Sequence, residues 1–282
     1  MKFIDVHGHI QQHDPAELDD ILRRANDANV GAIVIAGVTV EDSARCLELA
    51  KRYPQLLAGV GVHPTDLTGP MTADDVSALD RLAEDQNVVV MSEVGIDHQQ
   101  HILERPNPGP ASWVDIQAEA FRVQIEVARK HALPVVFHVR EPGDDPSANS
   151  AWPVAWDILR ETSAADLGGA AHYFQGDVAT ARALVDAGFM VSFARPLLRL
   201  RRLQEAAAFL PMDRIVLESD SYPQPFKKDR LKWTEPWHLA EVAARLAELR
   251  GMSVHHVMER TSENALVMMG DRSEAVRRLL ET

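Results

Sequence analysis

Two histidines near the N-terminus are the first residues of the sequence whose types and spacing suit chemistry. The segment reads Asp5-Val6-His7-Gly8-His9 and continues a short apolar start. Alternate residues of a strand face the same side, so His7 and His9 would present two imidazoles together, as metal ligands often do. Two histidines at this spacing also arise by chance, so the pair alone indicates a metal site only weakly.

Four later apolar runs also carry an ionisable residue close to their ends. These residues are Glu93, His138, His172 and Asp220. Buried charges are costly unless they are paired or bound to a metal, so their repeated placement asks for a common explanation. Each one singly has an ordinary explanation as a core histidine, a helix cap or an ion-pair partner. Together with His7 and His9 they supply enough donors for two divalent ions, and a carboxylate such as Glu93 can bridge them.

The elements that must position these residues form a regular alternation of strand-like and helical segments. The strand-like runs are residues 3–10, 31–38, 56–63, 88–97, 134–139, 169–174, 189–194 and 214–220. Most lack polar alternation, as expected of parallel strands that are covered on both faces. Amphipathic, helix-like segments occupy residues 16–28, 41–52, 73–85, 114–131, 178–187, 200–209 and 236–250.

This alternation predicts an α/β fold, a single (β/α)₈ TIM barrel, whose strand ends build the active site. An open doubly wound sheet is disfavoured because no GxGxxG opens its first turn. The stretch 253–282 has a further helical pattern, which predicts a C-terminal helical extension that caps the barrel. Loops rich in proline or glycine are expected at 105–110 and 141–150. We therefore predict one domain over residues 1–282.

The composition limits the classes of function. The chain has 282 residues and a formal net charge of -13, which repels polyanions at long range and argues against a general nucleic-acid coating role. The single cysteine, Cys46, excludes an intramolecular disulfide. The N-terminus lacks a secretory signal, and no apolar run approaches the length of a membrane span. These features predict a cytoplasmic enzyme that does not contact membranes.

One stretch departs from the acidic balance. Residues 195–232 contain nine basic and five acidic residues. In a barrel they would follow strands seven and eight, where phosphate sites commonly lie. The stretch therefore predicts a basic rim for a phosphate-bearing substrate, although a charge run can equally be a solvated helix end. Tyr222, Phe226 and Trp233 lie in the same stretch and would either stack on bases or pack the loop onto the barrel.

A series of short motifs extends along the chain. They are Asp5–His9, Gly61-Val62-His63-Pro64, Glu93–Asp97, the spaced Gln117, Phe121, Gln124 and Ala128, Leu133-Pro134-Val135, His138 with Arg140, His172 with Phe174 and Gly176, Glu218-Ser219-Asp220-Ser221, and Thr261 with Asn264. In order and spacing the series resembles the TatD-type metal-dependent deoxyribonucleases of the amidohydrolase superfamily. No single motif is specific, whereas the whole series is.

The resemblance implies two divalent ions and a set of ligands for each. The first ion is expected on His7, His9, Glu93 and Asp220. The second is expected on Glu93, His138 and His172. Glu93 and Asp220 are the expected catalytic residues, and Asp220 would orient or deprotonate the attacking water. His63 and Arg140 are expected to bind the substrate phosphate or to support the ligands. The native ion stays open among Mg²⁺, Mn²⁺ and Zn²⁺.

Three segments depart from the family pattern. The segment Glu218–Pro223 is one residue longer before its proline, Lys232–Pro236 replaces an Arg-Asn-Glu-Pro segment, and His98-Gln99-Gln100-His101 stands where the family tends to have aromatic residues. These departures leave the expected ligands intact and put the substrate in doubt.

The leading hypothesis is a metal-dependent phosphodiesterase, a deoxyribonuclease that acts on DNA ends as an exonuclease. The alternative is a hydrolase of a small amide, ester or lactone from the same superfamily. Many such relatives bridge their metals with a carboxylated lysine, and the strand around Glu93 contains no lysine, which favours the nuclease. A second alternative, an inactive binding barrel, would have lost at least one ligand, and none is lost.

Overall fold

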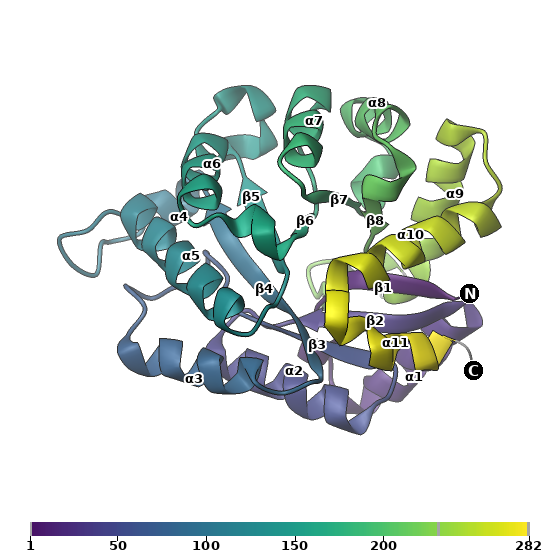
Figure 1. Ribbon diagram of the computed structural model, residues 1–282, viewed down its shortest axis with the longest axis horizontal. Helices are drawn as coiled ribbons and strands as arrows, with labels where there is room; N and C mark the ends of the chain where they lie inside the picture. The colour runs from purple at the N-terminus through teal and green to yellow at the C-terminus, as the bar shows by residue number, and fades with distance from the viewer. Residues whose placement is uncertain (1, 230–231, 281–282) are drawn as a thin grey trace.

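A barrel of parallel strands forms the centre of the computed structural model, which describes residues 2–229 and 232–280 (Figure 1). The strand order follows the sequence, and each strand pairs in parallel with the next. The strands are β1 (Phe3–Gly8), β2 (Val30–Ala36), β3 (Leu56–Val60), β4 (Val88–Asp97), β5 (Val135–Arg140), β6 (Gly169–Ala171), β7 (Met190–Phe193) and β8 (Ile215–Leu217). The predicted (β/α)₈ architecture is confirmed.

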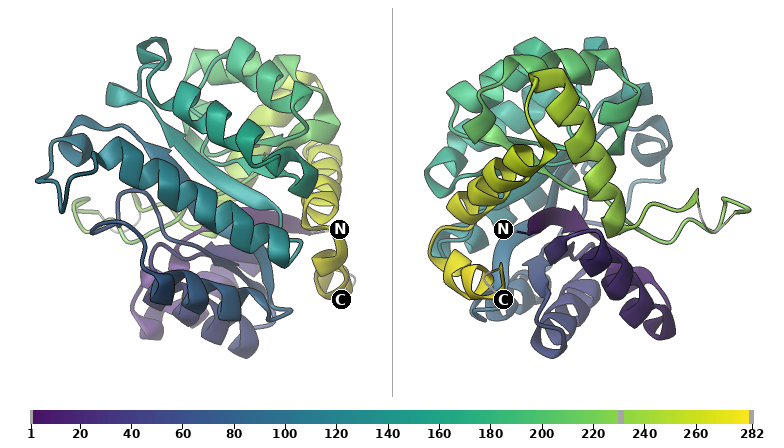
Figure 2. Two further views of the ribbon diagram at one scale, coloured as in Figure 1. Left: turned by 60° about the vertical axis from the view of Figure 1, so that its left-hand side comes forward. Right: turned by 90° about the vertical axis from the view of Figure 1, so that its right-hand side faces the viewer.

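Helices surround the strands and cover their outer faces (Figures 1 and 2). They are α1 (Pro15–Asp27), α2 (Val40–Arg52), α3 (Ala73–Ala83), α4 (Gln100–Leu103), α5 (Trp113–Lys130), α6 (Ala151–Glu161), α7 (Val178–Asp186), α8 (Arg201–Phe209), α9 (Leu239–Arg250), α10 (Val254–Met269) and α11 (Ser273–Leu280). Across the described ranges, no helix has the length and apolar character needed to cross a membrane.

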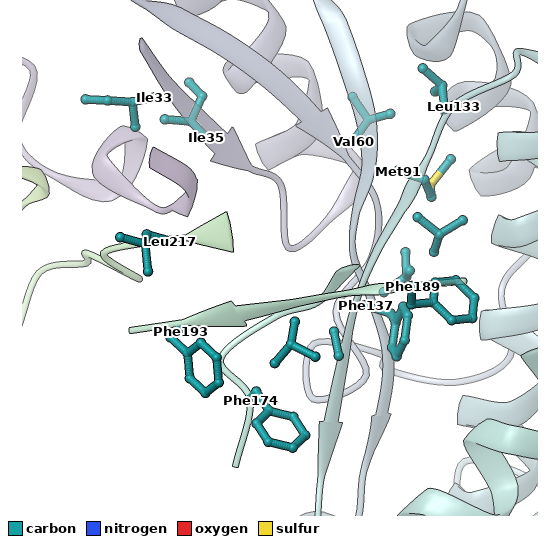
Figure 3. Close-up of a cluster of buried hydrophobic side chains, with 14 of the residues drawn as sticks. Ile33, Ile35, Val60, Met91, Leu133, Phe137, Phe174, Phe189, Phe193 and Leu217 are labelled. Atoms are coloured by element: carbon teal, nitrogen blue, oxygen red, sulfur yellow. The ribbon is translucent and has the colours of Figure 1, made fainter. Parts of the chain in front are cut away.

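The outer apolar layer lies between the strands and the helices (Figure 3). Phe137 of β5 shows how it is built, because its ring meets Phe121 of α5 and Phe189, with ring centroids 6.2 and 5.2 Å apart. All three side chains are fully buried. Burial of large aromatic side chains such as these is the main force that holds the helices on the barrel.

The inner apolar layer fills the barrel and includes residues from all eight strands, such as Val136 and Val216. Side chains from α10 and α11, among them Met269 and Leu280, belong to the same cluster. The side-chain amide nitrogen Nδ2 of Asn264 on α10 donates to the carbonyl oxygen of Ile215, where β8 begins. The C-terminal helices therefore close the end of the barrel at which the strands start and leave the other end open. The sequence predicted a helical cap without indicating its end.

The seam between β8 and β1 closes through backbone bonds just beyond the end of β8. The Asp220 N–H donates to the His7 carbonyl oxygen at 3.0 Å, and the His9 N–H donates to the Ser221 carbonyl oxygen at 2.6 Å. A Cβ atom at Gly8 would lie 2.9 Å from Ser221 Oγ, so this close approach favours glycine. The seam brings the two N-terminal histidines beside a carboxylate more than 200 residues away in sequence.

The structure differs from the prediction at several boundaries. β1, β6 and β8 end earlier than predicted, so His9, His172 and Asp220 stand in the loops just beyond them. The helix α6 was not predicted, because a proline stands in its first turn and a loop rich in proline precedes it. Proline is tolerated there since its missing N–H would have no partner within the helix. Glu141 instead accepts hydrogen bonds from the N–H groups of Ala151 and Trp152 at 3.0 Å each, which caps the helix.

Truncation of Phe121 should destabilise the protein strongly. Phe121→Ala removes a fully buried ring from the layer between α5 and the sheet, and we expect the free energy of unfolding to fall by about 3–5 kcal/mol. Urea unfolding followed by circular dichroism measures the change. The control Phe209→Ala truncates a side chain that is 53% exposed and should change stability by less than about 0.5 kcal/mol. Equal losses for both variants would contradict this packing.

Candidate metal centre

Glu93 of β4 lies at the centre of the site, and its two carboxylate oxygens face different histidines. Oε2 is 3.4 Å from His7 Nε2 and 3.3 Å from His9 Nε2. Oε1 is 3.2 Å from His63 Nε2, 3.2 Å from His138 Nδ1 and 2.8 Å from His172 Nε2. The Glu93 residue is only 4% exposed, so its charge is compensated almost entirely by these groups.

The side chains form three overlapping groups in which one donor atom per residue lies within 4.8 Å of the others. The groups are His7 with His9 and Glu93, His7 with His172 and Asp220, and His63 with Glu93 and His138. Imidazole nitrogens and carboxylate oxygens at such spacing are the ligands that Zn²⁺, Mn²⁺ and Mg²⁺ accept. The donor set therefore fits divalent ions.

All six predicted ligands come together at the open end of the barrel. His63, which the sequence suggested as a substrate contact, also lies against Glu93 and belongs to one of the donor groups. Its position makes it a further candidate ligand, and its role toward substrate stays a prediction. The signal was the same as for the other ligands, because His63 ends the strand-like run 56–63, whereas β3 ends at Val60 and the histidine stands in the loop beyond it.

The turn after β8 aims Asp220 at the site. Its φ of 48° lies in the left-handed region, which aspartate tolerates better than most residues other than glycine. The hydrogen bond from its N–H to the His7 carbonyl oxygen holds this turn in place. As a result the carboxylate oxygen Oδ1 lies 3.5 Å from His9 Nε2.

A second set of acceptors orients the imidazoles. His172 Nδ1 lies 3.1 Å from Glu218 Oε1, and His138 Nε2 lies 3.0 Å from Asp97 Oδ2. His9 Nδ1 lies 3.0 Å from the Ala36 carbonyl oxygen. Such bonds to the far nitrogen fix the tautomer and ring plane of a metal-binding histidine.

Sequence reasoning assigned no role to the carboxylates of Glu218 and Asp97. Glu218 is fully buried, and its Oε2 accepts a hydrogen bond from Ser192 Oγ at 2.5 Å. A signal was present, because each of these acidic residues ends an apolar run. The sequence did not show which histidine each carboxylate would orient, because this depends on contacts between strands far apart in the chain.

The electrostatics of the cluster favour an ionised Glu93 and raise the pKa of some imidazoles, whereas burial and the neighbouring His172 lower the pKa of His7. Burial opposes ionisation of Glu93, but the neighbouring His63 and His172 hold the pKa of its carboxyl well below the usual range. Burial also opposes protonation of His9, yet Asp220 and Glu93 raise the pKa of this imidazole to about 10. For His63 the same competition raises the pKa to about 9. At His9 and His63 a metal ion would therefore compete with a proton.

A cleft with a volume of about 670 Å³ lies above the cluster. Tyr173, Gln175 and Tyr222 line it together with the candidate ligands. Among the residues that the structure describes, Arg140 is the one arginine or lysine in its lining, and its Nε donates to Asp144 Oδ1 at 2.7 Å. Arg140 therefore stands in the wall of the candidate site, and its role toward substrate stays a prediction.

The predicted basic rim lies beside the cleft rather than in its lining. The Arg202 guanidinium donates to the carbonyl oxygen of Gln175, which lines the cleft, and Arg195 lies 3.6 Å from Glu241 of α9. The Arg201 side chain is 90% exposed. Arg230 lies outside the described residues. Contacts between these cations and a bound substrate stay predictions.

The sequence profile of the family described as TatD related DNase matches residues 4–270. The chain belongs to this family. The TatD assignment made from the motifs is thus confirmed. The chain is similar to the uncharacterized metal-dependent hydrolase YabD of Bacillus subtilis (strain 168), with 31% identity over 268 residues that cover 93% of this chain and 96% of YabD. It is also similar to the 3'-5' ssDNA/RNA exonuclease TatD of Salmonella typhimurium, with 27% identity over 88% of this chain and 90% of the relative.

A solved TatD structure has the same fold. The crystal structure of YJJV, a TatD homologue from Escherichia coli K12, matches with a TM-score of 0.78 and 24% identity, covering 94% of this chain and 97% of that chain. This likeness supports the barrel and its order of elements.

Metal binding by this TatD family protein should strengthen as the pH rises. His9 and His63 have raised pKa values of about 10 and 9, so without ions both are protonated at neutral pH. Because an ion binds only the neutral imidazole, it must displace these protons. We expect the affinity for Mn²⁺ to rise at least tenfold from pH 6.5 to 8.5, with protons released, as measured by isothermal titration calorimetry in buffers of different ionisation enthalpy.

The control for this titration is His255→Ala, which removes a histidine whose side chain is 66% exposed on α10. The variant should keep the same pH dependence. An affinity for Mn²⁺ that does not change with pH, or binding without proton release, would contradict the raised pKa values.

Glu218→Gln should weaken metal binding without removing a ligand. The substitution keeps the shape of the side chain but removes the charge that orients His172, and outer-shell changes of this kind cost about 10- to 100-fold in metal affinity. Calorimetry with Mn²⁺ measures the loss. The control Asp157→Asn alters a side chain that is 74% exposed on α6 and should leave the affinity unchanged. Equal affinities for both variants would refute the orienting role.

Proposed function

We propose that this TatD family protein is a divalent-metal-dependent phosphodiesterase that acts on the ends of DNA strands. The observation that carries the proposal is Glu93, whose two oxygens face separate groups of imidazoles at the floor of the cleft. A carboxylate between two ion sites suits phosphodiester cleavage, because two ions can stabilise the attacking and the leaving oxygen together.

We propose the following ligands for two ions, which would be Mg²⁺, Mn²⁺ or Zn²⁺. The first ion would be held by His7, His9, Glu93 and Asp220, and the second by Glu93, His138 and His172. His63 lies beside the second set. When bound, the ions would lower the pKa of a water molecule and stabilise negative charge on the phosphate.

The protein supplies a proton acceptor and a phosphate contact. Burial opposes ionisation of Asp220, but its hydrogen bond with His9 and the charge of His172 lower the pKa of its carboxyl, so it is ionised at neutral pH. It can therefore accept a proton from the attacking water. Arg140 would bind a phosphate oxygen from the cleft wall through guanidinium N–H groups that its two hydrogen bonds to Asp144 do not use.

The size of the cleft supports action at strand ends. A volume of about 670 Å³ is typical of sites that enclose a small molecule, and it suits one or two terminal nucleotides. The names of the family and of the Salmonella relative, a DNase and a 3'-5' ssDNA/RNA exonuclease, agree with such a substrate. A cytoplasmic location, expected from the sequence, is part of the proposal.

Two alternatives remain as outcomes of the test. Hydrolysis of a small amide, ester or lactone is disfavoured by Glu93, because β4 contains no lysine to carboxylate. An inactive binding barrel is disfavoured because all six candidate ligands are present and lie together.

The decisive variant is Asp220→Asn. The protein should cleave linear single-stranded DNA from its ends in the presence of Mg²⁺, Mn²⁺ or Zn²⁺, and the variant should lose about 10²- to 10⁴-fold in kcat because the proton acceptor is gone. Gel electrophoresis of end-labelled linear and circular strands, duplex DNA and RNA measures the products. Asp157→Asn, on the surface of α6, should retain full activity.

The same protein should be assayed against a panel of amides, esters and lactones. Activity confined to that panel would overturn the phosphodiesterase proposal in favour of the first alternative. Absence of any metal-dependent hydrolysis, with folded protein and bound ions, would favour the binding barrel.

A further inference from the structure

The segment that follows β8 extends away from the body of the barrel as an arm, seen at the right of the right-hand view in Figure 2. We use the word arm for residues 222–229. The arm starts at the active-site cleft, because Tyr222 lines the cleft and Asp220 is a candidate ligand two residues earlier. Consecutive residues of an extended chain span at most about 3.6 Å each, so Phe226 lies within roughly 15 Å of Tyr222.

Hydrogen bonds give the arm a defined base. The buried Gln224 accepts at its Oε1 from the Thr234 N–H at 2.9 Å and from Lys227 Nζ at 2.7 Å. Trp233 Nε1 donates to the Lys227 carbonyl oxygen at 3.3 Å, and its ring lies 5.8 Å from that of His13. Trp233 therefore packs the loop onto the barrel, which is one of the two roles that the sequence allowed.

Phe226 has the opposite environment. At 69% exposure it is the most exposed large hydrophobic residue within the described ranges. Lys227 Nζ lies 5.9 Å from the centre of its ring, and the neighbouring Lys228 is exposed. Proteins bind unpaired nucleic acid strands with exposed aromatic rings that lie beside positively charged side chains. The arm has this combination on a protein whose net charge is -13.

We propose that the arm binds an unpaired nucleic acid strand outside the cleft, with Phe226 stacked on a base and Lys228 beside the backbone phosphates. The inference rests on the proposed function, because it concerns the part of the strand that has not yet entered the cleft. A strand whose end lies at Glu93 must leave the cleft past its rim, and the arm begins at that rim. Base stacking is tolerant of sequence, so the arm would hold a strand in any register.

Binding is tested with fluorescein-labelled oligo(dT) of 20 nucleotides and the Asp220→Asn protein in the presence of Mn²⁺, because the substitution slows turnover during the measurement. Phe226→Ala should weaken binding about tenfold, and Phe226→Trp should restore it, because the indole also stacks. The control Phe209→Ala removes the other large exposed aromatic ring, on α8, and should have no effect. Lys228→Ala should lower the slope of log affinity against log salt by about 0.7, the value for one phosphate contact on a single strand.

Kinetics separate the arm from the cleft. In the otherwise unchanged enzyme, Phe226→Ala should raise KM for the 20-nucleotide strand about tenfold and leave kcat unchanged. A thymidine 5'-phosphate p-nitrophenyl ester is too short to reach the arm, and its hydrolysis should not change. A merely structural role for Phe226 would affect both substrates, and circular dichroism would show the loss of fold.

Three outcomes would overturn the proposal. Oligo(dT) binding that is unchanged in Phe226→Ala excludes stacking, and an equal loss on both substrates places the effect in the cleft. Binding to vesicles of anionic lipid that Phe226→Ala abolishes, with oligo(dT) binding intact, would make the arm a membrane contact instead. Failure of the proposed function can be distinguished from failure of this inference. If the protein cleaves no phosphodiester, the binding measurement with oligo(dT) still shows whether the arm holds a strand.

Discussion

The structure depends on one buried carboxylate that is shared by five imidazoles. Glu93 has lost nearly all contact with water, and a buried charge with no partner would cost several kcal/mol. Its two oxygens are compensated from opposite sides, by His7 and His9 at Oε2 and by three other histidines at Oε1. This arrangement requires five strand ends to meet around one atom pair. A closed barrel of parallel strands meets the requirement, because all its strands end on the same side.

The need to hold that cluster explains features further out. Glu218 and Asp97 set the planes of His172 and His138, so that the nitrogens of these rings point at Glu93. At Gly95 a Cβ atom would lie 2.0 Å from a backbone oxygen of β5, so only glycine lets β4 and β5 approach where they deliver their ligands. The opposite end of the barrel is closed by α10 and α11, and apolar packing there leaves the polar end free for chemistry.

The acidic and basic groups of the molecule occupy different places around the cleft. The candidate ligands and their supporting carboxylates place acidic groups at the floor of the cleft, and Arg140 is the cation at its wall within the described chain. An anionic substrate would therefore be attracted by the ions rather than by the protein floor. Exposed cations and the ring of Phe226 lie outside the cleft, where they would meet the part of a strand that has not entered it.

The sequence by itself determined the barrel and six candidate ligands through short-range patterns, namely apolar runs, their alternation with helical segments and an ionisable residue near the end of a run. It determined the family through the order and spacing of a motif series along the whole chain. Tertiary structure alone placed His63 against Glu93, because β3 ends three residues before this histidine and the path of the following loop sets the direction of its side chain. It also decided that Trp233 packs while Phe226 stays exposed, and that the described arginine and lysine side chains of residues 195–232 lie outside the cleft lining. These outcomes rest on contacts between residues far apart in the chain, and no local pattern specifies such contacts.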